Sequence, residues 1–259
     1  MKSLTECFNR EGWLLQEKLL SADQISQLND FLDTRRSRAE EAFRAWAGGD
    51  EKLTYGQHQA LLPEYEARGI PPDFRNFLVG QFDLETRLDQ RIVDLLSTPA
   101  MMNFVRDFCG ASEYYLHYPP MIRFKAPNAK QSVVPVHQDS AYSPHLTDFF
   151  TVWAPLTDID EACGGVVVYE GSHDMAEVKH EASGAWPNRS VVDLTPYKAK
   201  HIHMKAGDLL LFSKRLLHES APHTAPHLRY SIDFRVLPSP ESTTKSYYDP
   251  SSRTIVRRH

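Results

Sequence analysis

Two histidines and one aspartate stand out as candidate ligands of a metal ion. His137 and Asp139 are separated by one residue and follow a short apolar run that is typical of a strand. Side chains two residues apart on an extended backbone point to the same side, so this pair can converge on one ion. His218 lies at the end of another apolar run. Two histidines and one carboxylate match the facial triad that holds ferrous iron and leaves coordination positions open.

The His-x-Asp pair is a weak signal when it is taken alone. The chain has 12 histidines, so about one such pair is expected by chance, and a solvent-facing turn would explain it. Arg229 strengthens the pattern, because it lies eleven residues after His218 on another predicted strand. A buried arginine offers a rigid fork to a carboxylate. The combination favours a metal site with an organic anion beside it.

Composition excludes several other classes of protein. The 259 residues are 41% hydrophobic and 24% charged, as in a globular protein, and the net charge of −5 is not that of a nucleic-acid-binding protein. No apolar run approaches the roughly 20 residues of a membrane helix. The three cysteines form no C-x-x-C motif, which argues against a zinc–thiolate site. The N-terminus lacks the apolar core of a secretory signal, so we expect a cytoplasmic location.

The elements that must position these residues change in character along the chain. Helical periodicity predicts helices over 21–44, 84–96 and 98–110, whereas 48–83, rich in Gly, Pro and polar residues, is predicted to be irregular with one short helical turn. From residue 114 onward, short β-branched and aromatic runs predict strands. We expect these strands at 115–117, 121–124, 133–136, 149–156, 166–169, 200–205, 209–212 and 230–237.

About eight short strands after a helical segment favour one fold class. It is a mainly β fold with flanking helices, a cupin-like double-stranded β-helix or jelly roll preceded by N-terminal α-helices. No linker rich in Gly or Ser separates two parts. We therefore predict a single domain over 1–259, with a mostly helical buttress at 1–112, a jelly-roll core at 113–238 and a C-terminal extension at 239–259.

The order of the motifs resembles the phytanoyl-CoA dioxygenase family of iron- and 2-oxoglutarate-dependent oxygenases. That family's pattern is H-x-D, a distal H-x-S and an arginine about eleven residues later, and all three occur here. The resemblance covers nearly the whole chain. Glu170 departs from it, because the family usually has proline before Gly-Ser-His, but that position only shapes a turn. Other family-like segments follow in order at 11–15, 19–21, 124–127, 152–158, 164–165 and 171–173.

The resemblance implies roles for named residues. His137, Asp139 and His218 would hold Fe(II). Arg229 would pair with the C5 carboxylate of 2-oxoglutarate, and Ser220 would hydrogen-bond to it. The implied reaction uses O2 to couple oxidative decarboxylation of 2-oxoglutarate, to succinate and CO2, with oxidation of a C–H bond, most simply hydroxylation.

Three further residues are candidates for contact with 2-oxoglutarate. Lys125 and Trp153 match positions that touch the co-substrate or line its pocket in relatives. Arg123 lies two residues before Lys125, on the same face of the strand, and would contact the C1 carboxylate of 2-oxoglutarate or an anionic group of the substrate. Residue type alone also allows a core tryptophan and two solvated cations. His201 and His203 alternate around one residue, but surface imidazoles explain them as well as a metal does, so we assign neither a role.

The surroundings of the iron motif predict the kind of substrate. Tyr142, His145 and Thr151 lie close to the motif or on strands that face it, and the loop at 174–197 is polar. We therefore expect a small polar metabolite, although a solvated surface loop would look the same. Two rival functions remain open: a cupin-like metal protein or isomerase that does not use 2-oxoglutarate, and a silent binding relative. Arg229 argues against the first, and the complete triad argues against the second.

Overall fold

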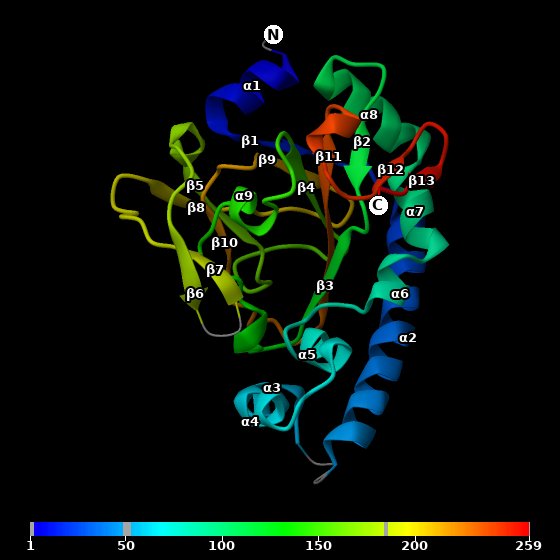
Figure 1. The fold of residues 1–259 in the computed structure, drawn as a ribbon, viewed down its shortest axis with the longest axis vertical. Coiled ribbons are helices and arrows are strands. Elements are labelled where there is room, and N and C mark those ends of the chain that lie inside the picture. Colours follow the sequence, from blue (N-terminus) through cyan, green and yellow to red (C-terminus); the bar gives the residue numbers. More distant parts are fainter. Residues whose placement is uncertain (1–2, 49–52, 184–185, 259) are drawn as a thin grey trace.

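The helices gather in the first part of the chain and the strands in the rest (Figure 1). The computed structural model describes residues 3–48, 53–183 and 186–258. No helix in those ranges is long and apolar enough to cross a membrane. The helices are α1 (Leu4–Glu11), α2 (Ala22–Ala47), α3 (Tyr55–Ala60), α4 (Leu62–Ala67), α5 (Pro72–Leu78), α6 (Leu84–Arg87), α7 (Gln90–Leu96), α8 (Pro99–Cys109) and α9 (Asp139–Tyr142).

Local capping explains where the main helices begin and end. The Ser21 side chain accepts a hydrogen bond from N of Gln24 while the Gln24 side chain accepts from N of Ser21, a capping box that starts α2. The Thr98 side chain caps α8 by accepting a hydrogen bond from N of Met101. Gly110 ends α8 at a φ of 61°, a left-handed conformation that favours glycine. These boundaries match the predicted helices over 21–44 and 98–110 closely.

Four of the element predictions are wrong in whole or in part. The strand predicted over 200–205 runs instead from Lys198 to His201. The segment 48–83 contains the short helices α3, α4 and α5, whose six or seven residues are too short to show a clear period. The helix predicted over 84–96 is two helices, because the Asp89 side chain accepts from N of Arg91 and starts α7 anew. Residues 133–136 form no strand. They directly follow a short 3-10 turn (Lys130–Ser132).

The strands form one large antiparallel sheet, a small one and a hairpin. The large sheet has the order β1-β9-β4-β11-β2-β12-β13, and β3 also pairs with β11; the small sheet has the order β10-β5-β8, and β6 pairs with β7. The strands are β1 (Trp13–Gln16), β2 (Tyr115–His117), β3 (Met121–Lys125), β4 (Phe150–Pro155), β5 (Val166–Glu170), β6 (His180–Ser183), β7 (Trp186–Ser190), β8 (Lys198–His201), β9 (Leu209–Ser213), β10 (His218–Ser220), β11 (Arg229–Leu237), β12 (Tyr247–Asp249) and β13 (Thr254–Val256).

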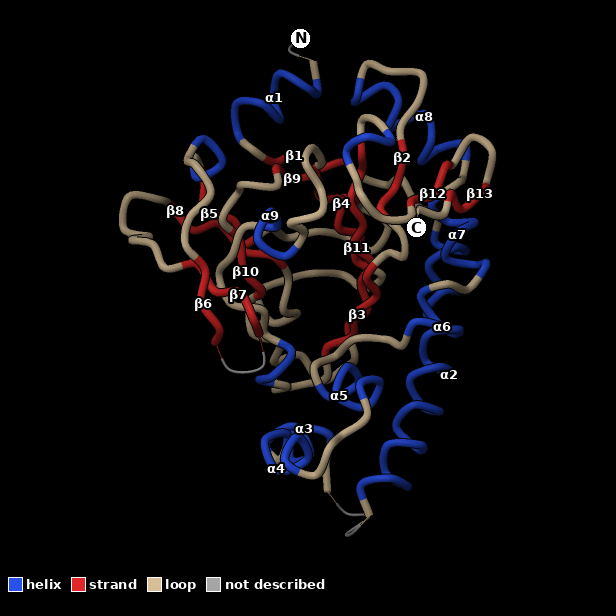
Figure 2. Tube along the Cα trace, in the orientation of Figure 1, coloured by secondary structure: helices blue, strands red, loops and turns tan. Residues whose placement is uncertain are grey.

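Strand β11 separates the packed core from the interior that holds the site. Its side chains alternate between the two faces of the sheet. The apolar set, from Tyr230 through Ile232 and Phe234 to Val236, joins a core cluster with residues of α2, α7 and α8. Figure 2 shows these helices around the outside of the strands. The opposite face of β11 carries only polar residues from Arg229 to Arg235, and burying them requires partners.

Candidate active site

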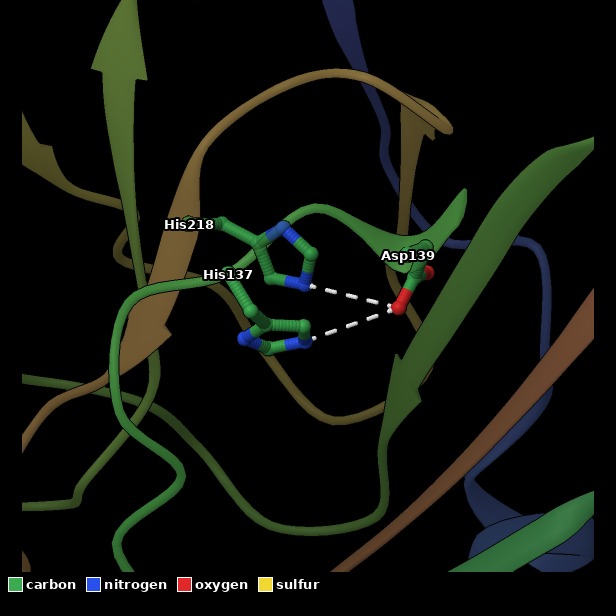
Figure 3. A group of neighbouring side chains, drawn as sticks. All are labelled: His137, Asp139 and His218. Carbon is green, nitrogen blue, oxygen red and sulfur yellow. Dashed lines mark ion pairs between the residues drawn. The ribbon is translucent and has the colours of Figure 1, made fainter. Parts of the chain in front are cut away.

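The three predicted metal ligands lie together inside the jelly roll (Figure 3). Nε2 of His137 is 3.5 Å from Oδ1 of Asp139, and Nε2 of His218 is 3.9 Å from the same oxygen. All three residues are buried. Both imidazoles direct Nε2 at one carboxylate oxygen, so a single ion can reach all three side chains. The assignment of these residues as iron ligands stays a prediction.

Backbone pairing sets the spacing of the two imidazoles. N of His137 donates to O of His218 at 2.9 Å, and N of His218 donates to O of His137 at 3.0 Å. This mutual pair leaves the ring centroids 4.1 Å apart. Gln138, which is fully buried, anchors the same segment because its side-chain amide donates to O of Arg215 at 2.9 Å. Side chains alternate along an extended backbone, so the side chain of Gln138 binds the surrounding backbone while those of His137 and Asp139 face the site.

The hydrogen bonds at Nδ1 of both imidazoles suit a metal at Nε2. Nδ1 of His137 lies 2.8 Å from O of Pro135, and Nδ1 of His218 lies 3.0 Å from O of Leu216. A carbonyl oxygen can only accept, so in the neutral ring the proton is on Nδ1 and the lone pair is on Nε2. Burial lowers the pKa of His218 to about 3, and neighbouring His137 adds to this shift. Neutral imidazoles are the form that ligates metal.

Asp139 is held as a carboxylate by cationic and hydroxyl neighbours. Thr151 on β4 donates to Oδ2, and Nη2 of Arg235 on β11 donates to Oδ1 at 3.0 Å. Burial opposes ionisation, but the guanidinium of Arg235 holds the pKa of Asp139 well below its usual range. The carboxylate is therefore charged and oriented in the absence of metal.

Arg235 and Asp233 are site residues that the sequence reasoning missed. Nη1 of Arg235 donates to Oδ1 of Asp233, and Oδ2 of Asp233 accepts from Nε of Arg123 at 3.4 Å. Both missed residues lie on the same face of β11 as Arg229, at spacings of two, which was the available signal. The pairing of Arg235 with Thr151 across β11 and β4 brings this cation to the carboxylate of Asp139.

A small inner cavity adjoins the histidines and holds the residues predicted to bind 2-oxoglutarate. Its volume is about 60 Å³. The cation Arg229 lies 5.5 Å above the centroid of the Trp153 ring, which forms part of the wall. Lys125 pairs with Arg229 across β3 and β11. All five co-substrate candidates line this cavity: Arg123, Lys125, Trp153, Ser220 and Arg229.

Arg229 and Lys125 are buried beside the inner cavity, and neither forms an ion pair with a carboxylate of the described residues. Arg229 and Lys125 are 3% and 2% exposed. Nη1 of Arg229 donates to Oγ of Ser231 at 3.1 Å, its Nε has no partner among the described residues, and Nζ of Lys125 donates to O of Ala221 at 3.0 Å. Burial lowers the pKa of Arg229 to about 10 and that of Lys125 well below its usual range. An organic anion beside these groups would remove that penalty.

A larger outer cavity of about 320 Å³ opens on the other side of the ligands. His137, Asp139 and Arg123 line both cavities. Tyr142 and His145, which the sequence indicated as pocket residues, line the outer one. Trp186, from the polar loop at 174–197, also lines the outer cavity. Lys179 and Glu181 of the same loop instead form an exposed ion pair with each other. The outer cavity is large enough to hold a small ligand beside His137 and Asp139.

The chain belongs to the phytanoyl-CoA dioxygenase family. A family model described as phytanoyl-CoA dioxygenase (PhyH) matches residues 8–231, which is most of the chain. This family is part of the superfamily of iron- and 2-oxoglutarate-dependent oxygenases, whose jelly-roll fold the antiparallel sheets and N-terminal helices share. The family and the fold class expected from the motifs are both confirmed.

Curated and solved relatives are more distant. The chain is 29% identical over 118 residues to 1-deoxypentalenic acid 11-beta-hydroxylase from Streptomyces exfoliatus and from Streptomyces arenae, a match that spans 41% of this chain and 42% of each relative. EvdO2 from Micromonospora carbonacea var. aurantiaca superposes with a TM-score of 0.63 at 18% identity, over 92% of this chain and 94% of that protein. The epimerase SnoN, solved with Fe3+, alpha-ketoglutarate and nogalamycin RO, gives 0.60 at 13% identity, over 90% and 82%.

Proposed function

We propose that the protein is an Fe(II)- and 2-oxoglutarate-dependent dioxygenase that hydroxylates a C–H bond of a small polar molecule. The observation that carries the proposal is the buried cluster in which Nε2 of His137 and of His218 both face Oδ1 of Asp139. The unpaired cation of Arg229 in the adjoining cavity supplies the partner for a dicarboxylate co-substrate. A plain metal-binding cupin needs no such cation.

Each wall of the site has a task in this reaction. His137, Asp139 and His218 would hold the iron, whose chemistry when bound is the activation of O2, with one oxygen atom going to succinate and one to the substrate. Arg229 pairs with the C5 carboxylate of 2-oxoglutarate, and Ser220 donates its hydroxyl to it. The apolar side of the inner cavity, with Trp153, excludes water from the co-substrate.

Hydroxylation is the outcome we favour over rearrangement. The curated relatives are hydroxylases, whereas SnoN is an epimerase of the same fold. Both outcomes begin with removal of a hydrogen atom from a substrate carbon, and they differ in whether an oxygen atom then stays on that carbon. With Asp139 as the proposed carboxylate ligand and many hydrogen-bonding groups around the outer cavity, the site is suited to leaving a hydroxyl group on the substrate.

Iron and co-substrate binding give the first test. Protein purified without metal should bind one equivalent of ferrous ion under anaerobic conditions and then develop a visible charge-transfer absorbance on addition of 2-oxoglutarate. Asp139→Asn should lose both signals. Asp148→Asn, which changes an exposed aspartate of the same region, is the matched control. Retention of both signals by Asp139→Asn would reject the proposed ligand set.

The reaction outcome needs a second test. Candidate small molecules are scored by substrate-dependent formation of succinate, and the product of each hit is analysed by mass spectrometry after turnover with isotopically labelled O2. We expect one labelled oxygen atom in the product. A product with the mass of the substrate would show epimerisation instead, and no succinate with any compound class would reject the use of 2-oxoglutarate.

A further inference from the structure

The wall of the outer cavity carries more cations than the acids beside it can balance. Four of its lining residues are arginines and two are aspartates. Asp139 is a proposed metal ligand and already accepts from Arg235. Asp233 accepts from Arg235 and, at 3.4 Å, from Arg123. Asp139 and Asp233 are therefore already paired with Arg235 or assigned to the proposed metal. Arg123 has only one long contact, with Asp233.

Arg87 has no acid of its own. Its Nε donates to O of Pro120 at 2.7 Å and its Nη2 to O of Pro119 at 3.4 Å. Within the described ranges, no carboxylate lies within ion-pair distance of this guanidinium. Arg87 lines the outer cavity but not the inner one, so 2-oxoglutarate in the inner cavity cannot be its partner. A guanidinium that is partly buried without an acid is well placed to bind an anion from outside the chain.

Two donors near Arg87 also lack acceptors. Nη1 of Arg123 and Nε1 of Trp186 are buried and make no hydrogen bond with any part of the chain that the structure describes. The Arg123 guanidinium lies 5.4 Å from the centroid of the Trp186 ring, and both residues line the outer cavity. An indole N–H and a guanidinium can only donate. Their natural ligand is an oxygen acceptor with negative charge.

The rest of the outer cavity is neutral. His117 and His145 lie with their ring centroids 4.7 Å apart, and burial lowers the pKa of both, so they are uncharged near pH 7. Val79, Met121 and Val134 add apolar surface to the wall, and Asn76, Gln81 and Ser143 add uncharged polar groups. A ligand that fits this wall has one anionic end and a small uncharged body. The volume of about 320 Å³ places it at the small end of ligand pockets.

We propose that the substrate of this enzyme is a small organic acid whose carboxylate binds between Arg87 and Arg123. The planar guanidinium fork matches a carboxylate in shape and charge. The uncharged body then lies along the rest of the wall toward His137 and Asp139, where oxidation takes place. This inference rests on the proposed dioxygenase function, which it deepens by naming the anchoring group of the substrate.

Matched probes test the charge requirement directly. Cyclohexanecarboxylate and benzoate, each beside its methyl ester, are titrated calorimetrically into the protein, both metal-free and loaded anaerobically with Fe(II) and 2-oxoglutarate. Each acid should bind at least about tenfold more tightly than its ester, because the ester loses the charge-assisted contact. Phenyl phosphate forms a third arm. Equal binding of acid and ester, no binding of either acid, or a preference for phenyl phosphate would overturn the inference.

Variants at the proposed anchor locate the binding. Arg87→Gln should weaken acid binding about tenfold or more, while Arg87→Lys, which keeps the charge but not the fork, should recover part of the loss. Arg75→Gln is the matched control, since it removes a cation from the same wall that already pairs with Glu66 at 2.9 Å. Unchanged acid binding in Arg87→Gln would overturn the inference.

Arg123→Gln separates the two anions that this side chain could meet. If Arg123 anchors the substrate, the variant loses acid binding in the metal-free protein, where no 2-oxoglutarate is present. A loss of 2-oxoglutarate affinity with unchanged acid binding would overturn the role of Arg123. Acid binding by a protein that binds neither iron nor 2-oxoglutarate would leave this site standing and reject the proposed dioxygenase, so the two failures are distinguishable.

Discussion

The structure contains two clusters of the same composition in very different settings. His137, Asp139 and His218 form one group of two histidines and a carboxylate, and His201, His203 and Glu161 form another. In the second group, Nε2 of His203 is 3.2 Å and Nδ1 of His201 is 3.6 Å from the carboxylate. These distances are as short as those in the first group. Residue types and the distances between the ligand atoms therefore do not distinguish a metal site from a surface cluster.

Burial and orientation do distinguish them. The Asp139 side chain is 3% exposed, whereas that of Glu161 is 83% exposed. Both histidines of the buried group face one carboxylate oxygen, whereas His201 and His203 approach different oxygens of Glu161. Backbone carbonyls fix the tautomers of the buried pair. An exposed glutamate keeps its conformational freedom and its hydration, which an ion would have to overcome.

The largest difference between the clusters should be in iron binding. His218→Ala removes one of the three proposed buried ligands, so we expect it to abolish stoichiometric binding of ferrous ion, measured by anaerobic titration. His203→Ala is the matched change in the exposed cluster and should leave one iron bound per chain. Loss of iron in His203→Ala, or its retention in His218→Ala, would reverse the roles of the two clusters.

The cation on Asp139 gives the next largest effect. Arg235→Gln leaves the buried carboxylates of Asp139 and Asp233 without their shared partner, which should lower the free energy of unfolding of the metal-free protein by about 3–5 kcal/mol. Arg253→Gln breaks the exposed pair with Asp94 and should cost less than about 1 kcal/mol. Urea unfolding monitored by circular dichroism compares them. Similar losses in both variants would show that burial does not separate these ion pairs.

Arg229 extends the buried cluster toward the co-substrate. Because no carboxylate of the described residues lies within ion-pair distance of Arg229, Arg229→Ala should weaken 2-oxoglutarate binding by roughly 2–5 kcal/mol while iron binding is retained. Calorimetric titration of 2-oxoglutarate into the anaerobic iron-loaded protein measures the loss. Arg215→Ala, an exposed arginine before β10, is the control. An affinity within threefold of the unmodified protein would place the carboxylate clamp elsewhere.

The buried cluster was predictable from the sequence because each of its parts has a local signature. Spacing of two on an extended backbone placed His137 and Asp139 on one side, and His218 was expected at the mouth of a strand, where it begins β10. The alternation of β11 also held a signal for Arg235, at a spacing of six from Arg229. The sequence did not indicate that Arg235 contacts Asp139. This contact depends on the pairing of Arg235 with Thr151, and so on the register between strands far apart in sequence.

The outer cavity was the least predictable part of the site. Arg87 comes from the four-residue helix α6, which the sequence merged with α7, and its place depends on packing against the turn at Pro119 and Pro120. Trp186 comes from the hairpin of β6 and β7, where a proline inside β7 argues against a strand. Short elements carry little periodicity, so their positions follow from tertiary contacts that one sequence does not display.

The smallest effect separates buried from exposed histidines without any metal. Burial lowers the pKa of His117 to about 3, and His145 and Arg235 add to this shift, whereas an unfolded chain titrates near 6.5. Between these values the unfolded state binds more protons than the folded state. The stability that neutral His117 contributes is therefore complete above about pH 6.5 and is lost progressively as the pH falls toward 3, with a slope of about 1 kcal/mol per pH unit. His218 shifts in the same direction, so His117→Asn should reduce the slope rather than remove it.

Urea unfolding of the metal-free protein between pH 7 and pH 5 measures this slope, with His203→Asn as the exposed control. An unchanged slope in His117→Asn, or an equal reduction in His203→Asn, would mean that burial is not what keeps these imidazoles neutral.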